Sequence, residues 1–440
     1  MAKKDLITKL YERKIHKPNA FLYSVIYHLG VLIYKKKYGM HWNIIDDPRK
    51  EEGPVVIIAN HASRNDYLFT AIPLYPLKFN FLAAYNEFFR NNLALLFRVM
   101  QLIPKRQFYS DSYAAFEIIR LVKQLKCNVV FYPEGLSSIS GANQPSALGT
   151  GKLLKFLKCP IYSVTTSGAY LIQPKYKFGH KERYAKTETV IKKVFSPEDL
   201  KNLSIEEIEA KVDEVLYNDD YEWAKNNHIV YKKNGEGIAE DLDTLLYKCP
   251  KCNHEFEMEA FDNIIHCKHC GNEAYINDDY TIHPKDETCK IPSTQKTWFD
   301  YIRIKEREAI LKDPDFEYSV ETTLGVIPKN RYLKMGETAI NVGKGTLTLS
   351  RKNGFSYVGT MNNEPYEIHI SNHDLYTFVM CYDATIIHFF YKGELRQFTF
   401  KTRGMAAKVL LLQNELHRIC KGEWQMLKNF KYDENECFDK

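Results

Sequence analysis

The first half of the chain alternates between two hydrophobic patterns. Short runs rich in β-branched and aromatic residues are separated by polar segments and by one stretch, residues 111–125, whose apolar positions recur at helical spacing. The runs predicted to be strands are residues 55–59, 79–84, 128–132, 160–165 and 187–195. Such alternation is typical of an α/β domain with a mostly parallel sheet flanked by helices. A Ser-Ile-Glu-Glu capping box at Ser204 predicts a further helix that runs to about residue 217.

The second half of the chain begins polar and becomes strand-rich. Residues 217–237 are polar and predict a loop, whereas residues 297–311 have the spacing of a helix. From about residue 318 strands dominate, and Asn353-Gly354 favours a tight hairpin turn because both residues tolerate positive φ angles. The later predicted elements are strands at 366–370, 375–381, 384–391 and 396–400 and a helix at 404–420. This order predicts a small β-rich C-terminal domain that resembles the pleckstrin-homology type.

The composition is that of a soluble globular protein. Apolar residues make up 45% and charged residues 26% of the 440 residues, which argues against a disordered chain or one with many membrane spans. The net charge of +6 permits contact with anionic lipid or nucleic acid but requires neither. Four of the ten cysteines form two Cys-x-x-Cys pairs and the others are scattered. This distribution favours a metal site in a reducing compartment over a disulfide scaffold.

One apolar segment near the N-terminus is a candidate for membrane contact. No apolar run reaches the roughly 20 residues needed to span a bilayer. The nearest, Phe21–Tyr34, is flanked by Lys17 and by lysines at 35–37, and it lacks the cleavage site of a signal peptide. A helix here would either lie in the lipid interface with its lysines towards anionic headgroups, or pack as a core helix on the first domain. A second apolar stretch at 92–103 could extend the same surface.

The two cysteine pairs have the spacing of a zinc ribbon. Fourteen residues separate the pair Cys249/Cys252 from the pair Cys267/Cys270. Each tight turn places two thiolates on one side, and four thiolates complete the tetrahedron that Zn²⁺ prefers. Four protein ligands leave no open position, so the expected Zn²⁺ is structural. The nearby histidines are expected to be exposed polar residues; they are His254, His266 and His269.

The spacing His-x4-Asp occurs three times, and only the surroundings distinguish the three pairs. In VVIIANHASRNDYLF an apolar strand leads into His61, and Asp66 follows where a helix would begin. A histidine just beyond a strand end lies at the edge where α/β sheets usually hold their sites. A carboxylate five residues later can fix the tautomer and leave the other ring nitrogen as a base. The pair at His41 follows no strong strand, and His369 lies within a strand-like run.

Three further segments accompany this pair in a fixed order. QLIPKR ends in Lys105 and Arg106, VFYPEGLSS places Glu134 and Gly135 after a strand, and CPIYSV opens a strand with Pro160. Together with Asn-His-x4-Asp, they resemble the four sequence blocks of the glycerolipid acyltransferases of the lysophosphatidic acid (1-acyl-glycerol-3-phosphate) acyltransferase type. Four ordered blocks are far more specific than any one of them.

The resemblance extends over about residues 20–215. The first block is matched by Asn60, His61 and Asp66, with Ser63 where the family often has serine, and the second by Arg106. The third is matched by Tyr132, Pro133, Glu134, Gly135 and Ser138, and the fourth by Pro160 and Ile161. Leu136 and Ser137 replace the Thr-Arg of the third block. If that arginine holds a phosphate, its absence weakens the case for a phosphorylated acceptor, unless Lys105 or Lys152 compensates.

The resemblance implies acyl transfer from a thioester to a free hydroxyl. His61 would deprotonate the hydroxyl and Asp66 would stabilise the resulting imidazolium, so no residue needs to become acylated. Arg106 would make charge-assisted hydrogen bonds to an acceptor phosphate. The residues that the resemblance assigns to substrate binding are Asn60, Ser63, Lys105, Arg106, Glu134 and Gly135. For Glu134 an ordinary buried pair with a neighbouring base remains an alternative.

These interpretations give an expected organisation. It comprises a membrane-interface helical segment at 1–40, an α/β acyltransferase domain at 41–217, a linker at 218–247, a zinc ribbon at 248–275, and a helix plus β-rich domain at 297–440. The expected partners are an acyl donor (acyl-CoA or acyl-carrier protein), a lysophospholipid acceptor and the membrane surface. The expected location is cytoplasmic and peripheral to the membrane.

Two alternatives stay open. The acceptor could be a non-phosphorylated lysolipid or an amino-lipid, as the Leu136-Ser137 departure hints. The chain could instead be a zinc-ribbon binding module for nucleic acid or protein. The ribbon offers only Lys251 and Lys268 as cations, next to glutamates at 255, 257 and 259. That is a poor footprint for a phosphate backbone, so no nucleic-acid partner is expected.

Overall fold

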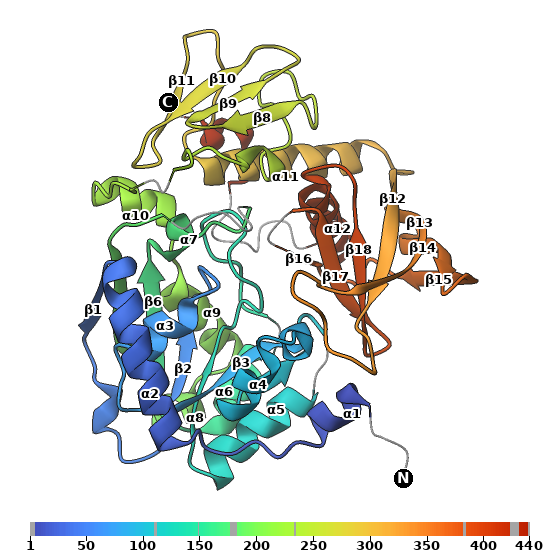
Figure 1. Ribbon diagram of the computed structural model, residues 1–440. Helices are drawn as coiled ribbons and strands as arrows, with labels where there is room; N and C mark the ends of the chain where they lie inside the picture. Colours follow the sequence, from blue (N-terminus) through green and yellow to red (C-terminus); the bar gives the residue numbers. More distant parts are fainter. Residues whose placement is uncertain are drawn as a thin grey trace.

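The computed structural model places three sheets and their helices in one molecule (Figure 1). It describes residues 5–109, 112–147, 149–176, 183–232, 235–381, 384–422 and 431–438. The first sheet lies in the N-terminal half, a small four-stranded sheet follows, and a second large sheet lies towards the C-terminus.

The first sheet has seven strands and is mostly parallel. Its order is β1 (Met40–Ile44), β7 (Thr187–Phe195), β6 (Ile161–Ser167), β2 (Val56–Ala59), β5 (Asn128–Phe131), β3 (Phe79–Ala84) and β4 (Ile103–Lys105). All neighbours run parallel except β6 and β7. The five strands predicted from the sequence are therefore confirmed, and so is the mostly parallel sheet.

The central strands are apolar throughout because both faces of the sheet are covered. Along β2, Val56 and Ile58 pack into one buried cluster, whereas Ile57 and Ala59 pack into another on the opposite face. Helices contribute to this covering. They are α3 (Asp66–Ala71), α5 (Ser112–Ile119), α6 (Thr150–Leu157), α8 (Pro197–Asn202) and α9 (Ile205–Leu216), with a π-helical turn at Arg120–Gln124 that extends α5. The capping box predicted at Ser204 is present at the start of α9.

The N-terminal segment forms helices with an exposed apolar side. Helix α1 (Leu6–Tyr11) is followed by α2 (Ala20–Gly30), which continues as a π-helix at Val31–Lys35. Phe21 is 73% exposed and Leu32 is 78% exposed, although Tyr23 on the same helix is buried. Helix α4 (Ala94–Val99), in the second apolar stretch, also exposes Leu95. Among the described residues, no helix combines the length and apolarity needed to cross a lipid bilayer.

Residues 217–237 differ from the loop that their polarity predicts. Helix α10 (Asp220–Asn226) lies within this segment, capped by the Asp219 side chain. Tyr221 and Tyr231 are buried, and the segment continues into the buried Ile238 and the short 3-10 helix at Leu242–Thr244. The expectation failed because a few buried aromatic residues, spaced among polar ones, secure the segment by tertiary packing that a local pattern does not show.

The cysteine-rich segment forms a small antiparallel sheet that packs on a long helix. Its order is β11 (Ile282–Pro284), β10 (Glu273–Ile276), β9 (Ile264–Cys267) and β8 (Met258–Phe261). Figure 1 shows it above α11 (Gln295–Lys312), the helix predicted at 297–311. The buried Lys248 ammonium lies 2.7 Å from Glu306 of this helix, and the Tyr301 hydroxyl donates to the Asn253 side chain at 2.8 Å.

The C-terminal sheet is antiparallel and has seven strands. Its order is β15 (Glu364–Ile370), β14 (Gly354–Met361), β13 (Ile340–Ser350), β12 (Glu317–Val326), β18 (Glu394–Thr399), β17 (Ile386–Tyr391) and β16 (Val379–Met380). Helix α12 (Met405–Lys421) packs against it and against α11. The predicted hairpin joins β13 and β14, and Gly354 has a φ of 75°. Asn353 is not among the residues with positive φ, so the turn is not the tight primed turn that was expected.

The C-terminal sheet packs directly on the first sheet's domain. Phe390 of β17 contacts Tyr85, with ring centroids 5.5 Å apart, in a shared cluster that also contains Phe88 and Leu395. The Leu333 amide donates to the Phe89 carbonyl at 2.8 Å, so backbone bonding supports the apolar contact. This interface lies beside the segment that carries the second sequence block, residues 101–106.

Candidate active site

His61 lies just beyond the carboxyl end of β2, where a parallel sheet presents its loops. Its Nδ1 is 2.7 Å from Oδ2 of Asp66, the first residue of α3. The ionised carboxylate accepts from Nδ1–H, which leaves Nε2 as the unprotonated ring nitrogen. The His61 side chain is 25% exposed and that of Asp66 is 5% exposed. The imidazole is therefore reachable while its partner is shielded.

Asp66 is held in position by the loop that precedes it. The Ser63 amide donates to Oδ1 at 2.9 Å, and the Ser63 hydroxyl donates to the same oxygen at 3.0 Å. These donors fix the orientation of the Asp66 carboxylate against the His61 ring. Ser63 thus orients Asp66, and its predicted contact with substrate remains a prediction.

The backbone of His61 is fixed by the buried side chain of Glu134. Oε1 accepts from the His61 amide at 2.6 Å, and Oε2 accepts from the Gln144 amide at 2.7 Å. The Ser138 amide in turn donates to the His61 carbonyl at 2.6 Å. Burial raises the pKa of Glu134 to about 8, although the two amide donors oppose the shift. Glu134 therefore joins the first and third sequence blocks inside the protein.

A second pair of hydrogen bonds fixes Asn60, the residue before His61. The Asn60 side-chain nitrogen donates to the Thr166 carbonyl at 2.9 Å, and the Thr166 backbone amide donates to the Asn60 side-chain oxygen at 2.8 Å. The two residues extend neighbouring parallel strands, β2 and β6. On the other side, the Tyr132 ring stacks on the imidazole, with centroids 4.7 Å apart. Backbone and ring of His61 are therefore both constrained.

The second block packs against the Pro-Glu-Gly turn. The Gln107 side chain donates to the Gly135 carbonyl at 2.8 Å, and Gly135 has a φ of 70° that favours glycine. The Arg106 guanidinium lies 4.7 Å from the Tyr11 ring centroid, and the Lys105 ammonium donates to the Tyr109 carbonyl at 3.0 Å. The structure thus brings the blocks together, while the predicted phosphate contacts of Arg106 and Lys105 remain predictions.

The other two His-x4-Asp pairs do not form the same arrangement. Asp46 accepts from the Lys193 amide at 2.9 Å, and His41 lies exposed on β1. His369 is exposed on β15 with Glu367 at 3.4 Å, as its strand-like surroundings predicted. Of the three pairs, His61 and Asp66 are joined by a hydrogen bond.

Two residues near the site are not marked by any sequence motif. Lys175 is buried beside the third block, where its ammonium donates to the Ser137 carbonyl at 3.3 Å. Burial lowers the pKa of Lys175 to about 7. Thr166, the partner of Asn60, also follows no motif. Both are brought to the site by segments more than thirty residues away in the chain.

The four cysteines of the two Cys-x-x-Cys pairs lie close together, as their spacing predicted. The sulfurs of Cys249 and Cys270 are 3.7 Å apart, and those of Cys252 and Cys267 are 3.8 Å apart. All four lie within 4.8 Å of one another. Tetrahedral Zn–S bonds of about 2.3 Å require sulfurs about 3.8 Å apart, so the arrangement fits a metal ion. The four cysteines could therefore hold one.

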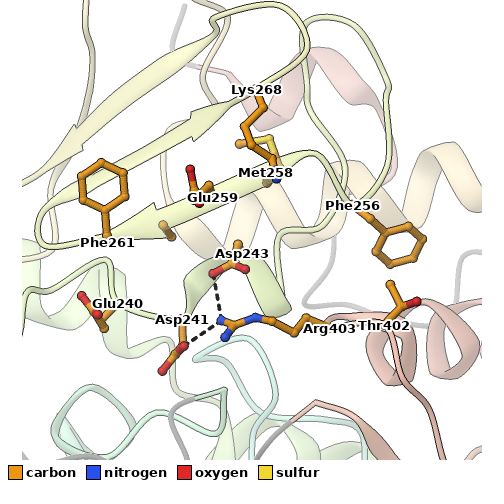
Figure 2. A pocket seen from close by; sticks show the side chains of 11 residues that line it. Glu240, Asp241, Asp243, Phe256, Met258, Glu259, Phe261, Lys268, Thr402 and Arg403 are labelled. Atoms are coloured by element: carbon orange, nitrogen blue, oxygen red, sulfur yellow. Dashed lines mark hydrogen bonds and ion pairs between the residues drawn. The ribbon is translucent and has the colours of Figure 1, made fainter.

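A cavity of about 630 Å³ lies at the boundary between the cysteine-rich sheet and the residues just before α12. Figure 2 shows the side chains that line it. Four carboxylates line it with a smaller number of cations. Arg403 is paired with Asp241 at 2.7 Å and with Asp243 at 3.4 Å. None of the residues that line the cavity is among those described above around His61. This cavity is therefore separate from the candidate active site.

Comparison with protein families supports the sequence blocks. Residues 43–167 match the family model described as Acyltransferase. No curated protein matches the chain. Among solved structures, the 1-acyl-sn-glycerophosphate (LPA) acyltransferase PlsC from Thermotoga maritima is similar over 44% of this chain and 77% of that chain, with 18% sequence identity and a TM-score of 0.38. The chain is therefore an enzyme with an acyltransferase domain at residues 43–167, and that domain contains the His61–Asp66 pair.

Proposed function

We propose that the protein transfers an acyl chain from a thioester to the hydroxyl of a lysophospholipid, with 1-acyl-glycerol-3-phosphate as the favoured acceptor, in phospholipid synthesis. The observation that carries this proposal is the 2.7 Å bond between His61 Nδ1 and Asp66, beneath a partly exposed imidazole. A shielded carboxylate and a reachable ring nitrogen are what general-base catalysis at a hydroxyl requires.

The proposed reaction needs no covalent enzyme intermediate. Nε2 of His61 takes the hydroxyl proton as the acceptor oxygen attacks the acyl carbonyl carbon. The carbon–sulfur bond then breaks, and the thiolate leaves with the proton that the imidazolium returns. Asp66 stabilises the imidazolium between these two transfers, so the products are an ester and a free thiol.

The remaining block residues divide into two proposed groups. Asn60, Ser63 and Glu134 bind protein groups around His61 and act as positioning residues. Lys105 and Arg106 supply positive charge beside the Gly135 turn and are the proposed contacts for an acceptor phosphate. The absence of an arginine at position 137 leaves a non-phosphorylated lysolipid as the second candidate acceptor.

We further propose that the four cysteines bind one structural Zn²⁺. The short sulfur–sulfur distances support this assignment, and four thiolates leave no position open for catalysis. For the C-terminal unit, the order of its seven antiparallel strands and the final helix α12 support a pleckstrin-homology-like description.

The exposed side of α2 supports attachment to a membrane surface. Phe21, Leu29, Leu32 and Ile33 are all more than half exposed, which is costly in water but favourable in the lipid interface. Lys35 and Lys36 follow on the exposed surface and can approach anionic headgroups. The protein would then meet its lipid acceptor without a membrane-spanning segment.

The first prediction concerns the catalytic base. His61→Ala should lower kcat by at least about a hundredfold because the acceptor hydroxyl loses its base. Release of free thiol from acyl-CoA, with lysophosphatidic acid as acceptor, measures the rate. His41→Ala is the matched control and should be near neutral. Equal losses in both variants, or none in His61→Ala, would contradict the assignment.

The second prediction concerns Arg106. A charge-assisted hydrogen bond contributes about 1.5–3 kcal/mol, so Arg106→Ala should reduce kcat/KM for a phosphorylated acceptor by about ten- to a hundredfold. The KM for the acyl donor should change little. Arg98→Ala is the control, since Arg98 also lies over a tyrosine ring, that of Tyr332 at 5.6 Å. An equal loss with acceptors that lack phosphate would make Arg106 structural.

The third prediction concerns the metal. Elemental analysis of the purified chain should find about one zinc per molecule, and the double variant Cys249→Ser, Cys267→Ser should lose it. Cys289→Ser, outside the cluster, should retain it. Because metal binding at such sites also supplies folding energy, chelation should speed hydrogen–deuterium exchange first around residues 245–275. Zinc-free protein with four reactive thiols would refute the site.

The fourth prediction concerns the membrane. The triple variant Phe21→Ser, Leu29→Ser, Leu32→Ser should bind vesicles containing phosphatidylglycerol more weakly than the unchanged protein in a flotation assay. Salt should weaken binding only in part, because apolar burial persists when charges are screened. Met335→Ser with Val358→Ser removes exposed apolar side chains elsewhere and serves as the control. Unchanged binding of the triple variant would move the contact to another surface.

A further inference from the structure

The C-terminal sheet turns one face of β17 towards the acyltransferase domain. Phe390 of this strand packs against Tyr85 at 5.5 Å and against Tyr109 at 6.1 Å, between ring centroids. Side chains two positions apart on a strand point to the same face. His388 therefore faces the acyltransferase domain as well. On that side the Tyr85 ring centroid lies 5.6 Å from the Arg106 guanidinium.

The His388 imidazole is buried with one nitrogen unsatisfied. The residue is 3% exposed, and Nε2 has no hydrogen-bond partner. Nδ1 lies 3.6 Å from the Cys381 sulfur. Burial, reinforced by the positive charges of Lys175 and Arg90, lowers the pKa of His388 to about 3. With Nδ1 accepting from the thiol, the neutral ring presents Nε2–H as a donor.

Lys175 approaches the same region from the acyltransferase domain. It follows helix α7 (Ala169–Ile172), is 2% exposed, and donates to the carbonyl of Ser137. Ser137 is the position where the resemblance expected an arginine. The Lys175 ammonium therefore lies beside the third sequence block, although the block itself contains no arginine at position 137. The positive charge of Lys175 contributes to the lowered pKa of His388, and the Glu134 carboxyl partly opposes the lowering of the Lys175 pKa.

The two domains also touch at the Pro-Glu-Gly turn. The Phe108 ring contacts Tyr376 of the C-terminal unit at a centroid distance of 5.9 Å. The same ring lies beside Gly135, where an added Cβ would be in ordinary van der Waals contact with it at 3.4 Å. The C-terminal unit therefore lies beside the Pro-Glu-Gly turn.

We propose that Lys175 and His388, one from each domain, bind the anionic headgroup of the acceptor, a phosphomonoester of the glycerol phosphate class. The inference rests on the proposed lysophospholipid acyltransferase function and assigns its acceptor specificity. A buried N–H without an acceptor is costly, and a phosphate oxygen would satisfy it. The Lys175 ammonium would contribute a charge-assisted hydrogen bond. The C-terminal sheet then completes the acceptor site.

The test compares two acceptors that differ only in phosphate. The full-length protein is assayed with 1-oleoyl-glycerol 3-phosphate and with 1-oleoyl-glycerol, using oleoyl-CoA and oleoyl-acyl-carrier protein as donors. Lys175→Met and His388→Leu should each reduce kcat/KM for the phosphorylated acceptor by about tenfold or more, as expected when a charge-assisted or buried hydrogen bond is lost. Transfer to 1-oleoyl-glycerol should change less than about twofold. Lys175→Arg should retain more activity than Lys175→Met.

Two controls carry the same substitutions elsewhere. Lys201→Met and His369→Leu change an exposed lysine and an exposed histidine, and neither should alter the ratio between acceptors. If the wild-type enzyme is active but Lys175→Met and His388→Leu lower kcat/KM equally for both acceptors, the inference is overturned. The acyl-transfer proposal would then still stand. A wild-type enzyme that acylates no lysolipid would instead overturn the proposed function.

A second measurement needs no variant and covers the case in which a substituted protein fails to fold. Hydrogen–deuterium exchange of the wild-type chain is compared with glycerol 3-phosphate, inorganic phosphate or glycerol added. Glycerol 3-phosphate should slow exchange in peptides that contain Lys175 and His388, and glycerol should not. Absence of protection would overturn the inference. Equal protection by inorganic phosphate would overturn the headgroup assignment in favour of a free-anion site.

Discussion

The candidate active site depends on the hydrogen bonds accepted by the buried carboxyl of Glu134. This carboxyl accepts one amide from each of two loops, that of His61 after β2 and that of Gln144 in the segment after β5. Leaving such a buried donor unsatisfied costs about 1–3 kcal/mol, so removal of this carboxyl would release both loops. Because the backbone of His61 is held in this way, its imidazole is left to bind Asp66 and to face the solvent. The proposed catalytic pair is thus oriented by groups that take no part in the proposed proton transfer.

The sequence predicted the elements whose signal is local. Strands β2 and β5 are covered on both faces, so each appears in the sequence as a short, continuous apolar run. The His61–Asp66 pair could be predicted because strand, loop and helix start follow within twelve residues, and the same spacing at His41 lacks that context. The cysteine cluster could be predicted because each half of a ribbon closes within one turn. In each case the information lies within a stretch of a few residues.

What the sequence did not predict depends on contacts between distant segments. The partner of Asn60 is Thr166, which is 106 residues away, and nothing near either residue marks the pairing. Lys175 reaches Ser137 only because α7 and the third block are neighbours in space. The bounds of strand β13 were not predicted because Gly343 and Gly345 interrupt its apolar pattern. In the structure, the close approach of β14 leaves no room for a Cβ at either position. Such features follow from the assembled fold and not from a local pattern.

A chain of buried polar contacts connects the cysteine-rich sheet to the C-terminal sheet. Lys248 joins the ribbon to Glu306 of α11, and the buried Arg303 of the same helix is 3.0 Å from Glu415 of α12. Helix α12 packs on the sheet that carries His388. Buried ion pairs add little net stability compared with apolar packing, but breaking one partner leaves a costly uncompensated charge. These pairs therefore act mainly by fixing one docking geometry. The folded cysteine-rich sheet thus supports the position of α11, of α12 and of the C-terminal sheet that carries His388.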